Sequence, residues 1–496
     1  MKIISLFFFC MASISILSCS QQEIKFTPST SEQFRPAYHF TPKKGWMNDP
    51  NGLVYLDGEY HLFFQHYPDS TVWGPMHWGH AVSKDLVNWE ELPIALFPDS
   101  LGTIFSGSAV YDAENSSELG TKENPPLVAI FTYHNALQEK AGTIDFQTQG
   151  LAYSVDKGKT WSKYAANPVL LNPGIRDFRD PKVTQITRED GKKVWLMTLA
   201  VKDRVQFHES PNLKDWTLLG EFGQGVGAHG GVWECPELIP MKAPDGSQKW
   251  VLLVSINPGG PQKGSATQYF IGDFKQGIFT PDDTMLRWLD YGPDNYAGVT
   301  WSNLPADQDR NLWIGWMSNW DYAQVVPTPT WRSALTLPRE LQLFDVDGTL
   351  LLKSAPAKEV DALKNTSYSL SGKESLLPSE AVEILAEVSG DDSFSLLLSN
   401  ELGEEVLVSK EMGLVTVDRR KAGKAAFHPD FAAAHAAPMS WEAKTVRIFL
   451  DASSLELFVN EGELVITSLL FPSSPWKKLI IQQGLEEVEI ISLKKP

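Results

Sequence analysis

Residues 52–64 read GLVYLDGEYHLFF, two runs of aliphatic, β-branched and aromatic residues that flank Asp57 and Gly58. Asp-Gly between two such runs is a strong signal for a β-hairpin, because both central positions of the favoured turn need a positive φ. Similar signals recur up to about residue 340, and long segments with the helical period of 3.6 are almost absent. The sequence therefore predicts an all-β protein.

A weak internal repeat subdivides this region. The segments SKDLVNW (83–89), SVDKGKTW (154–161) and SPNLKDW (210–216) each place a Ser before a polar turn and a Trp after it. Recurrence at roughly 55 to 70 residues is typical of the four-stranded blades of a β-propeller, and about 300 residues at that period make about five blades. Blades surround one axis, so residues far apart in the sequence can meet there.

The rest of the chain predicts a second domain. From about residue 366 alternating strands return, for example at 446–450, and about 130 residues of such strands are typical of a β-sandwich. We expect a five-bladed β-propeller at 36–340, a linker at 341–365 and a C-terminal β-sandwich at 366–496. The second domain has no cluster of Trp and carboxylate residues, which indicates a mainly structural role.

The first residues have the pattern of an export signal. Lys2 precedes an apolar run at 3–17 that is too short to span a bilayer permanently. The run ends in Ile-Leu-Ser before Cys19, which resembles a bacterial lipobox, and a polar tether follows at 20–35. We expect residues 1–19 to be a lipoprotein-type signal with lipidation at Cys19, and the protein to be anchored at the periplasmic face or on the cell surface of the outer membrane. Only Cys235 would then stay free, which excludes an intramolecular disulfide framework.

The composition excludes some partners and favours others. A net charge of −18 and a pI near 5.0 argue against nucleic acid and against anionic membrane surfaces, which need a basic footprint. Seventeen Trp residues are compatible with carbohydrate binding, because the indole face matches the flat C–H face of a sugar ring. For most of the seventeen, packing in the core of an all-β protein is the favoured interpretation. We expect a monomer whose only membrane contact is the lipid anchor.

Three carboxylates lie in unusual settings: Asp49 in WMNDPNG, Asp180 in FRDP and Glu234 in WECPE. Asp49 and Asp180 precede Pro, which favours extended backbone and belongs at strand ends or edges. A single Asp-Pro is commonly just a turn. Three carboxylates in Trp-rich surroundings, on a fold that can bring them together, indicate an active site.

Cleavage of a glycosidic bond needs one ionised and one protonated carboxyl group. Glu234 lies between Trp233 and Cys235, an apolar neighbourhood that favours the protonated acid. Asp49 has the amides of Asn48 and Asn51 nearby, which favour its ionised form. Adjacent residues of a strand point to opposite faces, so we expect Arg179 to reach the substrate or Glu234 rather than Asp180.

These motifs, together with Phe105-Ser106-Gly107-Ser108 and Trp331-Arg332, resemble glycoside hydrolase family 32, the invertases, inulinases and levanases. The resemblance covers almost the whole mature chain, and it implies a five-bladed propeller with a C-terminal sandwich and a funnel at the propeller axis. One departure is Ser333, where the family usually has Gly.

The resemblance also implies the roles of individual residues. Asp49 is the expected nucleophile, Glu234 the general acid/base and Asp180 the carboxylate that holds the fructosyl hydroxyls, with net retention and the Asp49 and Glu234 carboxyl groups about 5–5.5 Å apart. The residues expected to bind substrate are Trp46, Asn48, Gln65, Trp73, Phe105, Ser106, Arg179 and Trp316, with Trp46 and Trp316 forming walls.

The implied activity is hydrolysis of β-fructosyl bonds in levan, inulin or sucrose, without a cofactor or metal. His61, His66, His77, His80 and His134 match no closed zinc spacing. Alternatives are a fructosyltransferase with the same intermediate, a non-catalytic fructan-binding lipoprotein, and an inverting arabinan-cleaving propeller, which would lack the WMNDPNG signature. The sequence leaves open β-2,6 against β-2,1 preference and endo against exo attack, with exo as the commoner mode in the family.

Overall fold

The computed structural model describes residues 32–305 and 308–496. The predicted signal segment, its Cys19 and most of the predicted tether lie outside these residues. Within them the regular structure is strand, apart from the helix α1 (Ala136–Lys140) and the 3-10 helix η1 (Lys358–Leu363), which confirms the all-β prediction. Neither helix of this part of the chain has the length and apolar content that a bilayer crossing requires.

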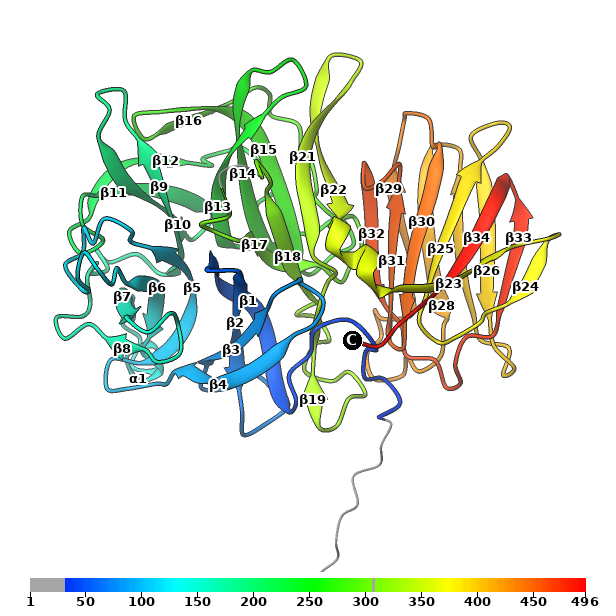
Figure 1. The fold of residues 1–496 in the computed structure, drawn as a ribbon, viewed down its shortest axis with the longest axis horizontal. Helices are drawn as coiled ribbons and strands as arrows, with labels where there is room; N and C mark the ends of the chain where they lie inside the picture. Colours follow the sequence, from blue (N-terminus) through cyan, green and yellow to red (C-terminus); the bar gives the residue numbers. More distant parts are fainter. Residues whose placement is uncertain (1–31, 306–307) are drawn as a thin grey trace, which may run out of the picture. The chain divides into compact units, whose positions relative to one another are not determined.

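Up to residue 356, the described chain forms five sheets (Figure 1). The first contains β1 (Gly45–Leu56), β2 (Glu59–Tyr67), β3 (His77–Ser83), β4 (Glu90–Leu96) and the late strand β19 (Trp331–Arg332). The second contains β5 (Thr103–Tyr111), β6 (Leu127–His134), β7 (Gln147–Ser154) and β8 (Ser162–Lys163), and the third β9 (Phe178–Thr187), β10 (Lys193–Val201), β11 (Arg204–Ser210) and β12 (Thr217–Phe222). The fourth contains β13 (Val232–Lys242), β14 (Gln248–Asn257), β15 (Ala266–Lys275) and β16 (Ile278–Pro281), and the fifth β17 (Tyr296–Thr300), β18 (Leu312–Met317), β20 (Ala334–Leu335), β21 (Arg339–Val346) and β22 (Thr349–Pro356).

The first strands of these sheets form a closed ring. β1 contacts β5, β5 contacts β9, β9 contacts β13, β13 contacts β17, and β17 contacts β1. β19 also pairs in parallel with β1, with Gly45 opposite Trp331, so a strand from near the end of the propeller joins its first blade. In the described residues the ring has five members, which confirms the predicted five-bladed propeller.

The predicted repeat marks one turn of the first three blades, the turn between the third and fourth strands. In each blade the indole nitrogen of the repeat Trp donates to a carbonyl three residues earlier: Trp89 to Leu86 at 2.9 Å, Trp161 to Gly158 at 3.0 Å and Trp216 to Leu213 at 3.0 Å. The Ser of each repeat caps the same turn with its hydroxyl. The repeat therefore encodes a hydrogen-bonded turn.

Ser333, the departure from the family pattern, lies between β19 and β20 with a φ of 75°. This left-handed conformation favours glycine, because it has no Cβ. The hydroxyl of Ser333 is buried without a hydrogen-bond partner among the described residues. The backbone conformation at this position explains why the family usually has Gly there.

The C-terminal part is a sandwich of two six-stranded sheets within the described chain. One contains β23 (Lys364–Ser369), β34 (Leu485–Leu493), β25 (Val382–Val388), β30 (Thr445–Asp451), β31 (Ser454–Val459) and β32 (Leu464–Leu469). The other contains β24 (Glu374–Leu376), β33 (Lys478–Gln483), β26 (Phe394–Ser399), β27 (Glu405–Glu411), β28 (Leu414–Lys421) and β29 (Ala434–Pro438). Alternate residues such as Ile384, Leu396 and Leu457 are fully buried between the sheets, as expected for strands with one face inward.

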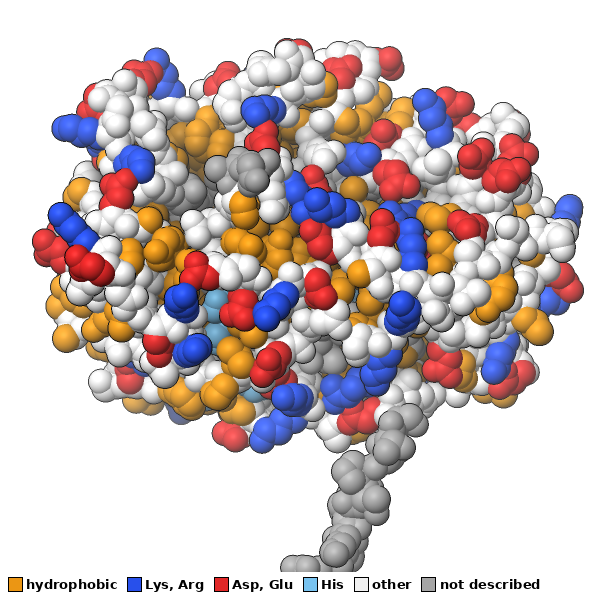
Figure 2. Space-filling model, in the orientation of Figure 1, with side chains coloured by type: hydrophobic (Ala, Val, Ile, Leu, Met, Phe, Trp, Pro, Cys, Tyr) orange, Lys and Arg blue, Asp and Glu red, His pale blue; other side chains and the backbone are white. Residues whose placement is uncertain are grey.

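The surface agrees with the acidic composition. On the face seen in Figure 2, Lys and Arg side chains lie among Asp and Glu side chains, with no continuous basic stripe. Such a mixture of charges is expected for a chain with 43 Lys and Arg and 61 Asp and Glu residues.

Candidate active site

The innermost strand of every blade has a β-bulge at the end that faces the candidate site. The ladder register shifts between Met47 and Pro50 in β1, between Ile104 and Gly107 in β5, between Arg179 and Lys182 in β9, between Glu234 and Glu237 in β13, and between Tyr296 and Val299 in β17. A bulge breaks the two-residue alternation of a strand and redirects side chains. The bulges therefore allow neighbouring residues to face the propeller axis together.

A cavity of about 260 Å³ lies where these bulges meet. All three predicted catalytic carboxylates line it: Asp49 from β1, Asp180 from β9 and Glu234 from β13. Six of the eight predicted substrate-binding residues also line it, namely Asn48, Gln65, Trp73, Phe105, Ser106 and Arg179. Residues as far apart in the sequence as Asn48 and Trp320 thus share one hollow, as the propeller interpretation requires.

Asp49 is buried and accepts hydrogen bonds on both oxygens. The Ser106 hydroxyl donates to Oδ2 at 2.6 Å and the Asn48 amide donates to Oδ1 at 3.0 Å. Trp46 donates its indole N–H to the Asn48 carbonyl oxygen at 2.7 Å, which orients the amide. Burial raises the pKa of Asp49, and the nearby Glu234 raises it further, while the bonds from Ser106 and Asn48 lower it.

The second donor expected for Asp49 has another function. Asn51 donates to the carbonyl of Pro50 at 2.8 Å and accepts from Gln65 at 2.8 Å. The role of Asn51 predicted from its proximity in sequence was therefore wrong, because the bulged strand turns its side chain toward Gln65. Ser106, from the next blade, supplies the second bond instead.

Asp180 has a φ of 63° at the bulge of β9. Its Oδ2 accepts the backbone N–H of Cys235 at 3.1 Å and lies 3.9 Å from the Arg179 Nε. The expectation that Arg179 and Asp180 point to opposite faces was wrong, because the bulge interrupts the alternation. Burial raises the pKa of Asp180 to about 7, with Arg179 lowering it and the Glu234 and Asp49 carboxylates raising it.

Glu234 is held by polar groups. Its Oε1 accepts from Arg179 Nη2 at 3.0 Å and Nε at 3.2 Å, and its Oε2 accepts from the Tyr296 hydroxyl. The predicted contact between Arg179 and Glu234 is thus present. The predicted apolar neighbourhood was wrong: Trp233 packs in the hydrophobic core of the propeller, and Cys235 turns its sulfur to within 3.6 Å of Asp49.

The aromatic walls differ from those predicted. Trp46 and Trp316 are fully buried in a cluster behind the cavity. Trp320 lines the cavity in their place, with its ring 5.8 Å from Trp46 and 4.9 Å from Trp316. Trp73, 40% exposed, stands edge-on to Phe105 at 6.0 Å on another side. Trp320 lies four residues after Trp316, and the spacing gave no sign of which indole faces the cavity.

A charged rim adds residues that the sequence did not single out as binding residues. Glu139, on α1, lies 3.2 Å from His134 and 3.1 Å from Arg176. The His134 ring stacks on Phe105, with centroids 4.2 Å apart. The cavity lining is completed by Phe146, Gln147 and Asp177. Only the folding of α1 over the cavity brings this rim together, so no local motif marks it.

The structure offers no candidate metal centre in its described part, where no group of three or more His, Cys, Asp or Glu side chains could hold an ion. His61 and His80 contact each other at 3.1 Å and stack with Phe63. Burial lowers the pKa of both His residues. These His residues pack within a blade, away from the carboxylates.

Comparisons with known proteins agree with this geometry. Residues 39–354 match the glycosyl hydrolases family 32 N-terminal domain, and residues 351–494 match the C-terminal domain of that family. Levanase from Bacillus subtilis (strain 168) is 44% identical over 487 residues, which cover 93% of this chain and 70% of the levanase. Extracellular exo-inulinase from Aspergillus awamori is 38% identical over 89% of this chain and 90% of its own length.

Solved structures give the same result. The exo-inulinase from Aspergillus awamori superimposes with a TM-score of 0.84 and 35% identity, over 94% of this chain and 99% of the other. A fructofuranosidase from Schwanniomyces occidentalis complexed with fructose superimposes with a TM-score of 0.82 and 32% identity, over 95% of this chain and 100% of the other. The chain therefore belongs to glycosyl hydrolase family 32 and is a glycoside hydrolase.

Proposed function

We propose that the protein hydrolyses β-fructosyl linkages of levan, inulin and sucrose with net retention, through a covalent fructosyl intermediate. The observation that carries this proposal is the arrival of Asp49, Asp180 and Glu234 from three blades at one sugar-sized cavity. The relatives named levanase, exo-inulinase and invertase support the substrate class.

Asp49 is the proposed nucleophile. Its oxygen forms a bond to the anomeric carbon of fructose while the glycosidic C–O bond breaks, and Glu234 gives its proton to the departing oxygen. Water then loses a proton to Glu234, attacks the same carbon and releases Asp49. The bonds from Ser106 and Asn48 favour the ionised nucleophile, which offsets part of the effect of burial.

Glu234 is suited to both proton transfers. Its side chain is 22% exposed, which allows exchange with water, whereas the side chain of Asp180 is 5% exposed. Arg179 and Tyr296 fix both carboxyl oxygens, so the acid is held in one orientation. The deeper Asp180 is the proposed acceptor for fructosyl hydroxyls, a role that needs its ionised form.

The test is chromatography of products from levan, inulin and sucrose, together with the anomeric configuration of the first product. We expect fructose as the sole early product from both fructans, released as the β-anomer. A ladder of oligosaccharides would mean endo attack, and longer oligosaccharides from sucrose would mean transfer. Release of the α-anomer would contradict retention, and binding without any product would contradict the enzymatic role altogether.

We infer that the protein is exported and anchored by a lipid on Cys19, with the periplasmic face or the cell surface of the outer membrane as its location. The lipobox-like pattern in the sequence supports this, as do relatives described as extracellular. In a bacterial host, labelled palmitate is expected to enter the wild type and a Cys10→Ala control but not Cys19→Ala. Equal labelling of the two variants would contradict the anchor.

We further infer that the catalytic domain runs through β22. Strand β21 pairs with β18, and β22 pairs with β21, so most of the expected linker at 341–365 joins the fifth blade. The family regions meet at 351–354, which supports a boundary near Pro356.

We also infer that the protein is a monomer. Light scattering is expected to give the mass of one chain, and a dimer mass would contradict the monomer.

A further inference from the structure

A short segment of the propeller, residues 290–296, connects the sandwich to the candidate acid/base. At one end it lies along β32, the edge strand of a sandwich sheet. The N–H of Tyr291 donates to the Val465 carbonyl at 2.9 Å. There is no space for a side chain at Gly292, where a Cβ would lie 2.1 Å from the Thr467 oxygen. At the other end, Tyr296 donates its hydroxyl to Glu234.

Two carboxylates hold this segment on the sandwich. Asp290 accepts the Thr467 backbone N–H at 2.9 Å, and Asp294 accepts the Leu469 backbone N–H at 2.8 Å. These two N–H groups lie on the open edge of β32. Edge strands with unpaired groups usually need a cover, and here the propeller supplies it.

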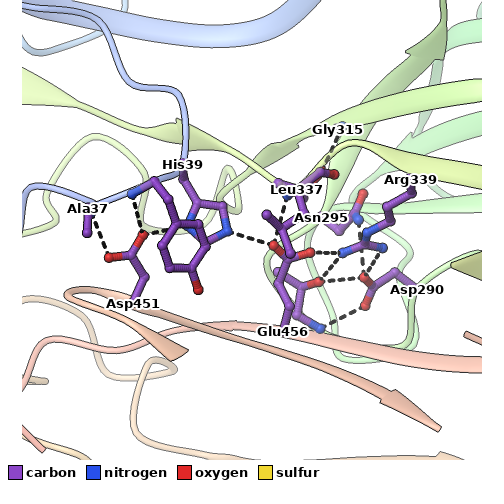
Figure 3. Close-up of polar contacts among 12 residues, drawn as sticks. Ala37, His39, Asp290, Asn295, Gly315, Leu337, Arg339, Asp451 and Glu456 are labelled. Atoms are coloured by element: carbon purple, nitrogen blue, oxygen red, sulfur yellow. Dashed lines mark hydrogen bonds and ion pairs between the residues drawn. The ribbon is translucent and has the colours of Figure 1, made fainter. Parts of the chain in front are cut away.

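Figure 3 shows the Asp290 end of this contact. The fully buried Arg339 of β21 donates to Asp290 at 2.9 Å and also to Glu456 of β31. His39 bridges Glu456 at 2.7 Å and Asp451 at 2.8 Å. The charges at this end are therefore shared among several partners from both domains.

The Asp294 end depends on one guanidinium from the sandwich. Arg419, on β28, donates to Asp294 Oδ2 at 2.5 Å and to the Tyr322 hydroxyl at 2.9 Å. The same hydroxyl donates to Asp294 Oδ1 at 2.5 Å. Arg419 and Asp294 are both fully buried. Asp294 lies two residues before Tyr296, and Tyr322 lies two residues after Trp320, which lines the cavity.

We propose that Arg419 of the β-sandwich is a positioning residue for the candidate acid/base: by holding Asp294 it fixes the strand that carries Tyr296, and thereby keeps the Tyr296 hydroxyl on Glu234. The sandwich domain thus takes part in orienting a catalytic carboxyl group. This inference rests on the proposed function.

Removal of Arg419 would leave the Asp294 carboxylate buried without its cation, a strongly unfavourable state. The segment is expected to relax, and Tyr296, the first residue of β17, lies only two residues further along the chain. Hydrogen bonds weaken steeply with poor geometry, and a displacement of about 1 Å near the chemistry can lower the rate by about 100-fold. The expected effect is therefore on turnover rather than on stability alone.

The experiment compares Arg419→Met, Arg419→Lys and Tyr296→Phe in the full chain, with sucrose as substrate. Arg419→Met is expected to lower kcat by about 10- to 100-fold, and Arg419→Lys by less, because a cation remains. Tyr322→Phe serves as a milder second variant, since it removes only the hydroxyl that joins Arg419 to Asp294.

The decisive measurement is a double-mutant cycle. In the Tyr296→Phe background, Arg419→Met and Tyr322→Phe are expected to add little to the loss of kcat, because the hydrogen bond through which they act, from Tyr296 to Glu234, is already absent. The matched control is Lys410→Met, which removes another buried cation of the same sheet; Lys410 donates to the Trp441 carbonyl at 3.0 Å. This control is expected to lower the melting temperature and to leave kcat within about twofold.

Additive losses in the cycle, or an equal loss of kcat in Lys410→Met, would overturn the positioning role. If Arg419→Met does not fold, Tyr322→Phe in the same cycle decides the question. A wild type that releases no fructose from any fructan or from sucrose would refute the proposed function itself. An active wild type with additive losses of kcat in the cycle would refute only the positioning role of Arg419.

Discussion

Replacement of Ser106 by alanine is expected to move the acid limb of the pH–rate profile to higher pH. The Ser106 hydroxyl donates to Asp49 at 2.6 Å in a buried site. A hydrogen bond to a charged group contributes about 1.5–3 kcal/mol, and one pKa unit corresponds to about 1.4 kcal/mol. Because the bond favours the ionised nucleophile, its loss raises the already raised pKa of Asp49 further.

The assay is kcat/KM for sucrose across the acid range, since this parameter reports the ionisations of the free enzyme. At pH values below the acid limb, kcat/KM of Ser106→Ala is expected to be about 10- to 100-fold lower than that of the wild type. Above the limb, the kcat/KM values of the two enzymes are expected to converge. Ser108→Ala is the matched control. Ser108 lies on the same strand and is also buried, but its hydroxyl donates to the Pro181 carbonyl at 2.9 Å, so the limb is expected to stay in place.

The reasoning would be refuted if the acid limb of folded Ser106→Ala coincides with that of the wild type. The ionisation that limits activity would then belong to another group, with Asp180 as the first candidate because burial raises its pKa to about 7. An equal displacement in Ser108→Ala would also refute it, since the cause would be a general disturbance of β5.

Three further predictions concern single side chains. Asp49→Ala and Glu234→Ala are each expected to abolish fructose release while the far-UV CD spectrum stays native; substantial residual turnover in either would reverse the assigned roles. Trp73→Ala is expected to raise KM by about 5- to 30-fold, the equivalent of about 1–2 kcal/mol, with kcat nearly unchanged, because an exposed aromatic wall binds ground and transition states alike; a fall in kcat alone would contradict this. Burial opposes a charge on His39, yet two carboxylates raise its pKa to about 9 from an ordinary 6.5, so its contribution to stability is complete below pH 6.5 and is lost as pH rises through 9; in urea titrations the difference from His39→Gln should shrink over that range, and a constant difference would disprove it.

Much of this protein could be predicted from local sequence patterns. Hairpins such as 52–64 and the repeated Ser-turn-Trp segments are encoded by residues close in sequence, because turn conformations and indole-to-carbonyl bonds involve near neighbours. The carboxylates were recognisable because each lies in an unusual Pro-containing motif. The linker was less predictable, since β21 joins the fifth blade only by pairing with β18, and β22 only by pairing with β21.

The direction in which side chains point could not be predicted from alternation. Arg179 and Asp180 face the same cavity because a bulge intervenes, and a bulge is visible only against the partner strand. The same limit applies to Trp316 and Trp320, of which the second lines the cavity. Tyr296 carries no motif at all, and its contact with Glu234 joins two different blades.

The sequence by itself determined the all-β class and the repeated blade turn, and it singled out the three carboxylates of the candidate site, since each depends on residues within a few positions of one another. Only the tertiary structure decided which groups hold those carboxylates: Ser106 on Asp49, the Cys235 backbone on Asp180, and Tyr296 on Glu234. Hydrogen bonding and desolvation act over a few ångströms of space, regardless of distance along the chain. Such effects arise only after the blades close into a ring.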